Sequence, residues 1–274
     1  MSRTPELFDI HTRDLRRRRA SGGNFLLDEI ILEAQERRIT VNRTFSSPAV
    51  VSWSPAAWRR AVPDAHVVPD HDTLDLAPQA HDLVIHGNSL HLANDPVGQL
   101  IQCRRALMND GLFLGFAFGG QTLNELRSAL AATEIELTGG MSPRVVPMGE
   151  IRDLGALLQR AGFALPVADS FTLKASYPDL LSLAADLRSM GETNCLSERH
   201  RAYLGKAFLR RAEEIYRQNY AEETGRLRAT FEVIVLTGWA PDESQPQPLR
   251  PGSAAQRLAD ALGTNETPLP RQDD

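Results

Sequence analysis

The sequence contains few of the residues that mark secreted, zinc-binding or membrane proteins. Its two cysteines, Cys103 and Cys195, form no CxxC pair. A disulfide-rich module and a cysteine-rich zinc site are therefore excluded, and a reducing compartment is favoured. No apolar run approaches the roughly 18 residues of a membrane-spanning helix, and the N-terminus lacks the apolar core of a signal peptide. We expect a cytoplasmic protein without a membrane span.

An excess of positive charge is also missing. The chain has 30 Lys and Arg against 35 Asp and Glu, a formal net charge of −5. This balance argues against a general nucleic-acid binder. The basic run Arg16–Arg19 is short and has acidic neighbours, which disfavours a transit peptide. It is interpreted as a solvated helix face or as a contact for an acidic partner.

The motifs of metal-dependent and acyl-transfer catalysis are absent as well. None of the seven histidines has an acidic residue two positions further on, so half of an iron-binding facial triad is missing. Neither HExxH nor the nucleophile elbow GxSxG occurs. We predict no metal site and no acyl-transfer chemistry.

Glycine is missing from one long stretch and paired in another. No glycine occurs between Gly23 and Gly87, whereas Gly119-Gly120 follows an apolar run at 111–118. Thr122 and Glu125 then form a predicted capping box at the start of a helix. In open α/β sheets ligands gather where strands end and helices begin. The stretch 111–143 is therefore expected to form one wall of a site, unless it is a strand–turn–helix without a ligand.

Alternating apolar and amphipathic segments predict a doubly wound α/β sheet. Strands are predicted over 49–53, 65–68, 82–86, 111–118, 171–176 and 229–239. Helices are predicted over 5–20, 24–38, 56–61, 96–108, 122–134, 150–161, 178–190 and 197–220. The expected organisation is an N-terminal helical arm (1–45), a main domain (46–240) with a helical cap (178–220), and a proline-rich tail (241–274), mostly disordered.

Seven stretches, taken together in order and spacing, resemble one family. They are Ser89–Pro96, Gly119–Arg127, Gly139–Pro143, Asp153–Leu158, Arg160–Phe163, Met190–Cys195 and Tyr216–Tyr220. Over about residues 80–255 the chain is similar to the methyltransferase-like assembly factors of respiratory complex I. These are class I S-adenosylmethionine (SAM) methyltransferases in fold, near the malonyl carrier-protein methyltransferases of biotin synthesis.

The resemblance implies a Rossmann-like sheet of seven strands, with an antiparallel return and a helical cap between the last two strands. It also implies SAM as the cofactor and a complex I subunit as the partner or substrate. In the mitochondrial member the family is linked to hydroxylation of an arginine rather than to methylation.

The chain departs from the SAM-binding pattern of this family early in the sheet. That pattern has a glycine-rich loop after the first strand, an acidic residue after the second and an aspartate after the third. Here the first strand leads into Trp53 and Pro55, which add bulk and remove a donor. The interval from Ala49 to Asp70 also lacks room for one strand and helix, so the sheet is truncated in its N-terminal half. We expect a partner-binding protein with a degenerate or lost SAM site; the alternative is an active SAM-dependent methyltransferase or a protein-arginine-modifying enzyme.

Candidate site residues fall into three groups, and the cleft in which an enzyme would modify a protein side chain is expected between 86–95, 119–127 and 139–143. The catalytic candidates are His91, Glu125 and Asn194, and the cofactor candidates are Asp70, Gly87 and Asn88. The candidates for contact with a substrate or partner are Gly119, Gly120, Thr122, Arg127, Gly139, Gly140, Ser142 and Tyr216. Structural alternatives stay open, because His91 also fits a turn, Glu125 a helix cap, and Tyr216 packing against Tyr220 at i+4.

Overall fold

The computed structural model describes residues 6–21, 23–201 and 204–246. The chain divides into two units, residues 1–242 and 243–274, and the fold below is that of the first. Most of the proline-rich tail predicted to be disordered lies outside the described residues. Within the described part, no helix has both the length and the apolarity to cross a membrane.

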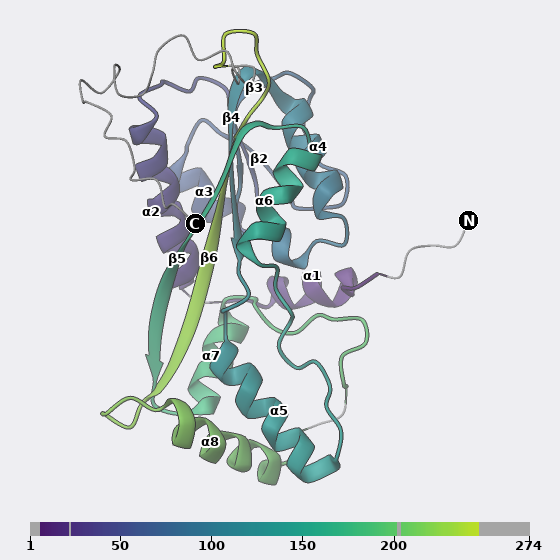
Figure 1. Cartoon of the computed structure of the whole chain (residues 1–274), viewed down its shortest axis with the longest axis vertical. Helices are drawn as coiled ribbons and strands as arrows, with labels where there is room; N and C mark the ends of the chain where they lie inside the picture. The colour runs from purple at the N-terminus through teal and green to yellow at the C-terminus, as the bar shows by residue number, and fades with distance from the viewer. Residues whose placement is uncertain (1–5, 22, 202–203, 247–274) are drawn as a thin grey trace, which may run out of the picture. The chain divides into compact units, whose positions relative to one another are not determined.

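A six-stranded sheet forms the centre of the first unit (Figure 1). Its strands are β1 (Pro48–Val51), β2 (His66–Val68), β3 (His81–His86), β4 (Leu107–Phe118), β5 (Ala164–Tyr177) and β6 (Leu227–Trp239). Their spatial order is β2-β1-β3-β4-β6-β5. The first four strands are parallel, and β6 runs antiparallel to both β4 and β5. The predicted Rossmann-like α/β class is confirmed, with an antiparallel return at its end.

The sheet has six strands where the family resemblance implies seven. Strand β2 pairs directly with β1, Ala49 opposite His66, so no strand fits between them. The short α3 (Pro55–Ala61) connects the two. The missing element thus falls in the interval from Ala49 to Asp70, as its length predicted.

Helices cover both faces of the sheet because its central strands are apolar on both sides. On one face lie α2 (Phe25–Thr40) and α3, which bury Ile30 and Trp58 against the strands. On the other lie α4 (Pro96–Ala106) and α6 (Ile151–Arg160), which bury Leu100 and Leu158.

Three further helices gather where β5 and β6 extend beyond their neighbours (Figure 1). They are α5 (Asn124–Thr138), α7 (Leu180–Ser189) and α8 (Lys206–Tyr220). The last two connect β5 to β6 and form the helical cap. The helix predicted over 197–220 is shorter than expected, since it begins at Lys206. Tyr216 is buried in this region and donates a hydrogen bond to the carbonyl of Arg228 over 2.8 Å.

The predicted capping box at Thr122 and Glu125 is wrong. Helix α5 begins at Asn124, after Leu123 in a left-handed conformation with φ of 53°. The Thr122 hydroxyl donates to the carbonyl of Glu232 and accepts from its N–H, while Glu125 accepts from the N–H of Thr230. Strand β6 continues past the end of β4 and leaves backbone groups without a strand partner. Thr122 and Glu125 satisfy those groups, so a long-range contact replaces the local cap.

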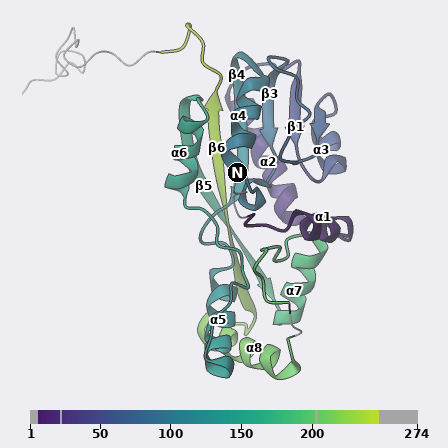
Figure 2. The same ribbon diagram turned by 90° about the vertical axis from the view of Figure 1, so that its right-hand side faces the viewer.

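Helix α1 (Ile10–Arg18) is shorter than the predicted 5–20 and begins after Asp9, whose carboxylate accepts from the N–H of Thr12. Figures 1 and 2 both show it between the sheet and α7. It lies beside the ends of the first three strands. A short 3-10 turn, η1 (Leu90–Leu92), follows β3 in the same region.

Candidate functional site

The carboxyl ends of the parallel strands meet at one edge of the sheet. We call the ends of β1, β2 and β3, with residues 52–54, 69–71 and 87–89, the carboxyl edge. The N–H of Ser52 donates to Val68 and that of Gly87 donates to Val51, so the three chain turns are adjacent. Trp58 lies directly beneath, since a Cβ added to Gly87 would come within 2.6 Å of its indole nitrogen. The edge is filled from below by an aromatic side chain.

A buried ion pair lies on the other side of the carboxyl edge, next to a hollow of about 340 Å³ whose lining includes Arg17, Trp53 and Asp70. Nη1 of Arg17, on α1, lies 2.7 Å from Oδ2 of Asp70, and Nη1 of Arg13 lies 3.7 Å from the same oxygen. The Arg17 guanidinium also lies over the Trp53 ring at 5.3 Å. Burial alone would raise the pKa of Asp70, but the charges of Arg17 and Arg13 outweigh it, so this pKa is below its ordinary value. Asp70 therefore stays ionised and is paired within the chain.

A buried histidine extends this polar cluster. His86 ends β3, is fully buried, and its Nε2 lies 2.9 Å from Oε1 of Gln99. The Gln99 amide donates in turn to the carbonyl of His71 over 3.1 Å. Burial lowers the pKa of His86 to about 4, so the imidazole is neutral at pH 7. The side chains of α1, the strand ends and α4 thus form one polar network at the edge.

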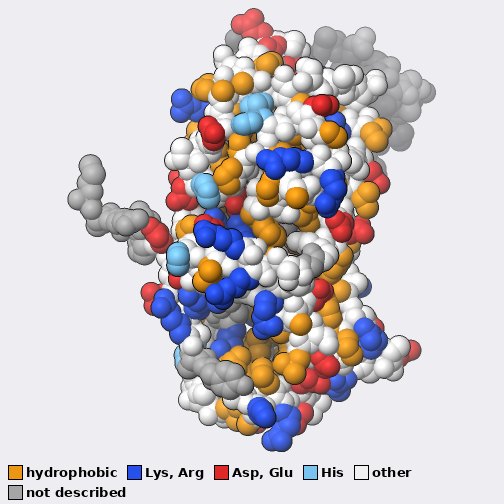
Figure 3. All heavy atoms as spheres, turned by 180° about the vertical axis from the view of Figure 1, so that it is seen from behind, with side chains coloured by type: hydrophobic (Ala, Val, Ile, Leu, Met, Phe, Trp, Pro, Cys, Tyr) orange, Lys and Arg blue, Asp and Glu red, His pale blue; other side chains and the backbone are white. Residues whose placement is uncertain are grey.

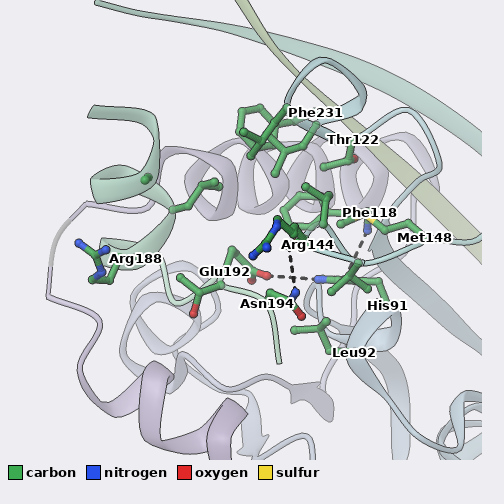
Figure 4. Close-up of a pocket in the computed structure, with 17 residues that line it drawn as sticks. His91, Leu92, Phe118, Thr122, Arg144, Met148, Arg188, Glu192, Asn194 and Phe231 are labelled. Carbon is green, nitrogen blue, oxygen red and sulfur yellow. Dashed lines mark hydrogen bonds and ion pairs between the residues drawn. The ribbon is translucent and has the colours of Figure 1, made fainter. Parts of the chain in front are cut away.

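A cavity of about 200 Å³ lies next to this edge, under the cap (Figure 4). We call it the cap pocket. Its walls come from η1, the end of β4, the start of α5, residues 144–148, α7 and the segment after α7. Its lining residues are His91, Leu92, Phe118, Thr122, Leu123, Leu126, Arg144, Val145, Val146, Met148, Ala184, Leu187, Arg188, Glu192, Thr193, Asn194 and Phe231. Most of the surface is apolar, so a few polar groups decide what it can bind.

His91 and Glu192 form the main polar pair of the cap pocket. Nε2 of His91 lies 3.3 Å from Oε2 of Glu192, and the backbone N–H of Phe118 points at Nδ1 of His91 over 3.5 Å. An acceptor role at Nδ1 leaves the imidazole proton on Nε2, where it donates to the carboxylate. The side chains are 1% and 10% exposed, respectively. Glu192 thus keeps one carboxylate oxygen for another donor in the pocket.

Two arginines border the cap pocket in different states. Arg144 is paired with Glu134 at 2.6 Å and lies over the Phe208 ring at 4.9 Å, so its charge is balanced. Arg188 is exposed and has no ion pair among the described residues. Asn194 holds this wall, since its amide donates to the carbonyls of Pro143 and Arg144 over 2.8 and 3.0 Å.

The predicted candidates separate into three places. His91, Thr122 and Asn194 line the cap pocket, and Asp70, Gly87 and Asn88 lie at the carboxyl edge. The remaining candidates lie elsewhere. Gly119 and Gly120 pack against the carboxylates of Glu232 and Glu150, and Arg127 donates to the carbonyls of Gly120 and Thr122. Glu125 binds β6, and Tyr216 is buried in the core. Gly139, Gly140 and Ser142 follow the end of α5.

Comparison with known proteins identifies relatives by sequence. No family model matches the chain. "Arginine-hydroxylase NDUFAF5, mitochondrial" of Rattus norvegicus is 37% identical over 206 residues, 75% of this chain and 60% of that protein. The Homo sapiens protein of the same name is 39% identical over 193 residues, 70% of this chain and 56% of that protein. The chain is related to the NDUFAF5 arginine-hydroxylases.

A second group of relatives carries a methyltransferase name. The malonyl-[acyl-carrier protein] O-methyltransferase of Laribacter hongkongensis is 32% identical over 177 residues, 65% of this chain and 57% of that protein. The family resemblance predicted from the seven stretches is confirmed. The chain spans about 60% of the length of the NDUFAF5 relatives.

Solved structures of methyltransferases are similar at low identity. A putative methyltransferase from Bacillus halodurans has a TM-score of 0.47 at 13% identity, covering 76% of this chain and 98% of that one. A phosphoethanolamine N-methyltransferase from Haemonchus contortus, in complex with S-adenosyl-L-methionine, has a TM-score of 0.42 at 11% identity, covering 85% of this chain and 57% of that one.

Sequence reasoning missed four polar residues of the cap pocket, namely Arg144, Arg188, Glu192 and Thr193. Glu192 lies inside the matching stretch Met190–Cys195, from which only Asn194 was selected. Its partner His91 is 101 positions away, and no local pattern connects the two. Arg144 follows directly after Gly139–Pro143. The only available signal for Glu192 was an acidic residue two positions before the selected Asn194.

Proposed function

We propose that the chain is a partner-binding protein of the complex I assembly-factor type, which holds a partner's side chain in the cap pocket and works without SAM. The observation that supports it best is the difference between two neighbouring sites. In the cap pocket Glu192 keeps a carboxylate oxygen for another donor, whereas at the carboxyl edge, beside a hollow of about 340 Å³, Asp70 is paired with Arg17 and Arg13 of the same chain. The relationship to the NDUFAF5 proteins supports the assembly role.

The residues at the carboxyl edge do not fit SAM. A glycine loop would let backbone amides approach the cofactor, but β1 is followed by Ser52, Trp53, Ser54 and Pro55. An acidic group could bind the ribose hydroxyls only if its oxygens were accessible. Asp70 is 3% exposed and paired with two guanidinium groups. The same residues that would have to bind the cofactor are engaged with each other.

The cap pocket fits one arginine side chain. Its volume of about 200 Å³ is below the roughly 300 Å³ of the smallest typical cofactor pockets. Phe118, Met148 and Phe231 offer apolar contact for an alkyl stem, and the remaining oxygen of Glu192 offers an acceptor for a guanidinium. The name arginine-hydroxylase of the relatives agrees with this ligand chemistry.

The surface beside the cap pocket is basic. Figure 3 shows Lys and Arg side chains gathered on the face that carries α1 and α7. The exposed Arg18, Arg19 and Arg188 have no ion pair within the described part of the chain. Such a surface fits a partner whose inserted arginine is surrounded by acidic residues.

Two titrations test this proposal. In the first, SAM and S-adenosylhomocysteine are titrated into the full chain by calorimetry, and no heat is expected at millimolar ligand. In the second, N-acetyl-arginine amide is titrated and followed by NMR, with N-acetyl-glutamine amide as control. Shifts at Glu192 and Phe118 with the arginine compound alone are expected. Micromolar SAM binding, or equal response to both amides, contradicts the proposal.

An active protein-arginine-modifying enzyme is the second candidate. His91 is the observation that favours it, because an imidazole beside a carboxylate, facing a pocket, is a common base arrangement. Incubating the chain with SAM and a peptide library, followed by mass spectrometry, separates the two candidates. A modified arginine whose formation is lost in His91→Ala favours the enzyme, and an unmodified library favours binding.

A further inference from the structure

Helix α1 supplies arginine side chains to the carboxyl edge. Arg13 and Arg17 are 3% and 7% exposed although both are charged, and both face Asp70. Arg17 also contacts the Trp53 ring, and its charge lowers the pKa of His86 in addition to burial. In open α/β sheets this edge is where a separate ligand binds. Here the N-terminal segment of the same chain is bound there.

The contact between α1 and this edge is a buried ion pair, although apolar side chains of similar volume would often be at least as stable there. Burying two charges costs several kcal/mol per ion, and replacing such a pair with apolar side chains is often neutral or stabilising. Arg17 keeps Nε and Nη2 without a hydrogen-bond partner among the described residues. A guanidinium held by a carboxylate and an aromatic face is the arrangement by which a site binds a cationic ligand.

The same segment is bound to the wall of the cap pocket. Phe8 pairs with Leu196 in a β-bridge, and the N–H of Asp9 donates to the carbonyl of Cys195 over 2.8 Å. Arg16 donates to the carbonyl of Asn194, and Arg199 pairs with Asp9 at 3.1 Å. Gly191, with φ of +77°, packs against Arg17 and Trp53. The segment 191–199, which includes Glu192, is therefore held at several positions by α1 and by Phe8 and Asp9 directly before it.

We propose that α1 is a built-in ligand of the carboxyl edge, with Arg17 bound by Asp70 and Trp53 where a separate ligand would bind, and that its seating holds residues 191–199 in place. Arg17 is a positioning residue, because it acts on the cap pocket through the wall that α1 contacts. The relevance of this wall for partner binding rests on the proposed function. The occupation of the edge by α1 does not.

Chemical rescue in the full-length chain tests the proposal. Arg17→Ala leaves space for a guanidinium beside Asp70, so ethylguanidinium is expected to bind there and restore the lowered Tm, whereas ethylammonium is not. Hydrogen exchange of residues 191–199 is expected to become about tenfold faster in Arg17→Ala, and to slow again with ethylguanidinium. The amides of α6 serve as an internal control.

The matched control is Arg19→Ala, which removes an exposed arginine of the same segment. It is expected to change neither the Tm nor the exchange. If Arg17→Ala does not fold, the Tm and the hydrogen exchange of Arg17→Lys are compared with those of Arg19→Lys, because lysine keeps the positive charge at both positions. Unchanged exchange at 191–199 in both Arg17 variants overturns the proposal, as does a failed rescue of folded Arg17→Ala.

Titrations with SAM and with N-acetyl-arginine amide distinguish a failure of this proposal from a failure of the proposed function. If folded Arg17→Ala binds SAM in the micromolar range, α1 is a removable cover over a working cofactor site, and the built-in ligand is refuted. If Arg17→Ala is rescued by ethylguanidinium while the wild-type chain ignores N-acetyl-arginine amide, the built-in ligand stands and the arginine pocket fails. No SAM binding in either form is the expected result.

Discussion

The carboxyl edge and the cap pocket are neighbouring sites that differ in how their carboxylates are paired. At the edge Asp70 is held by two arginines of the chain, and His86 and Gln99 bind each other. In the cap pocket Glu192 has one histidine partner and a cavity beside it, and Arg188 stands exposed at the border. The edge pairs its carboxylate within the chain, whereas the cap pocket keeps a carboxylate oxygen available for a ligand, as the proposed function requires.

The sharpest test of the edge is to remove its central carboxylate. Asp70→Ala leaves the buried guanidinium group of Arg17 without its counter-ion and Arg13 with Asp14 alone, and is expected to lower the free energy of unfolding by about 3–5 kcal/mol. Urea denaturation measures it, with the exposed Asp72→Ala as control. The double change Arg17→Met with Asp70→Leu is expected to regain most of the loss. Equal effects of Asp70→Ala and Asp72→Ala would show that the edge is not an internally balanced site.

Acid should weaken the edge through His86. Because burial lowers its pKa to about 4, the folded chain keeps His86 neutral while the unfolded chain takes up a proton below its ordinary value of 6.5. Stability is thus full above pH 6.5 and falls as the pH drops towards 4, by about 3 kcal/mol for this shift. Asp70, whose pKa is lowered, adds a loss only below the ordinary carboxyl pKa of about 4.

Denaturation from pH 7.5 to 4.5 checks this expectation, with His86→Gln as the comparison. The glutamine does not titrate and keeps a donor for Gln99, so the slope should shrink. The groups that act electrostatically on His86 are Asp70, His91 and Arg17. An unchanged slope in His86→Gln would show that another group causes the loss of stability in acid.

The sheet could be predicted from the sequence because hydrophobic runs such as Leu83–Ile85 and Phe231–Leu236 are local patterns. The direct pairing of β1 with β2 could be predicted too, since the interval from Ala49 to Asp70 is too short for a further strand and helix. The ion pair of Arg17 with Asp70 could not be predicted, because these residues are 53 positions apart. The contact between His91 and Glu192 could not be predicted for the same reason, since these residues are 101 positions apart. The local capping pattern also failed at Thr122, because its hydroxyl bonds to Glu232 of β6, 110 positions further along the chain.

The cap pocket is tested by neutralising its free acceptor. Glu192→Gln keeps the size of the side chain but removes the charge, and is expected to weaken binding of N-acetyl-arginine amide at least about tenfold, since hydrogen bonds to charged groups contribute about 1.5–3 kcal/mol. NMR titration measures it. The exposed Glu198→Gln, in the same segment, is the matched control. Equal affinities in the two variants would place the ligand elsewhere.

The second glycine pair gives the smallest effect and separates conformation from recognition. Gly139 ends α5 with φ of +72°, whereas Gly140 has no positive φ, and both residues are exposed. Gly139→Ala is expected to lower the free energy of unfolding by about 1 kcal/mol, because a Cβ is disfavoured in the left-handed region. Gly140→Ala should have no effect on stability, as measured by urea denaturation. Neither change should alter binding at the cap pocket, because both residues lie outside its lining. A loss of arginine-amide binding in Gly140→Ala, at unchanged stability, would extend the recognition surface to the end of α5 and restore the glycine pair as a contact.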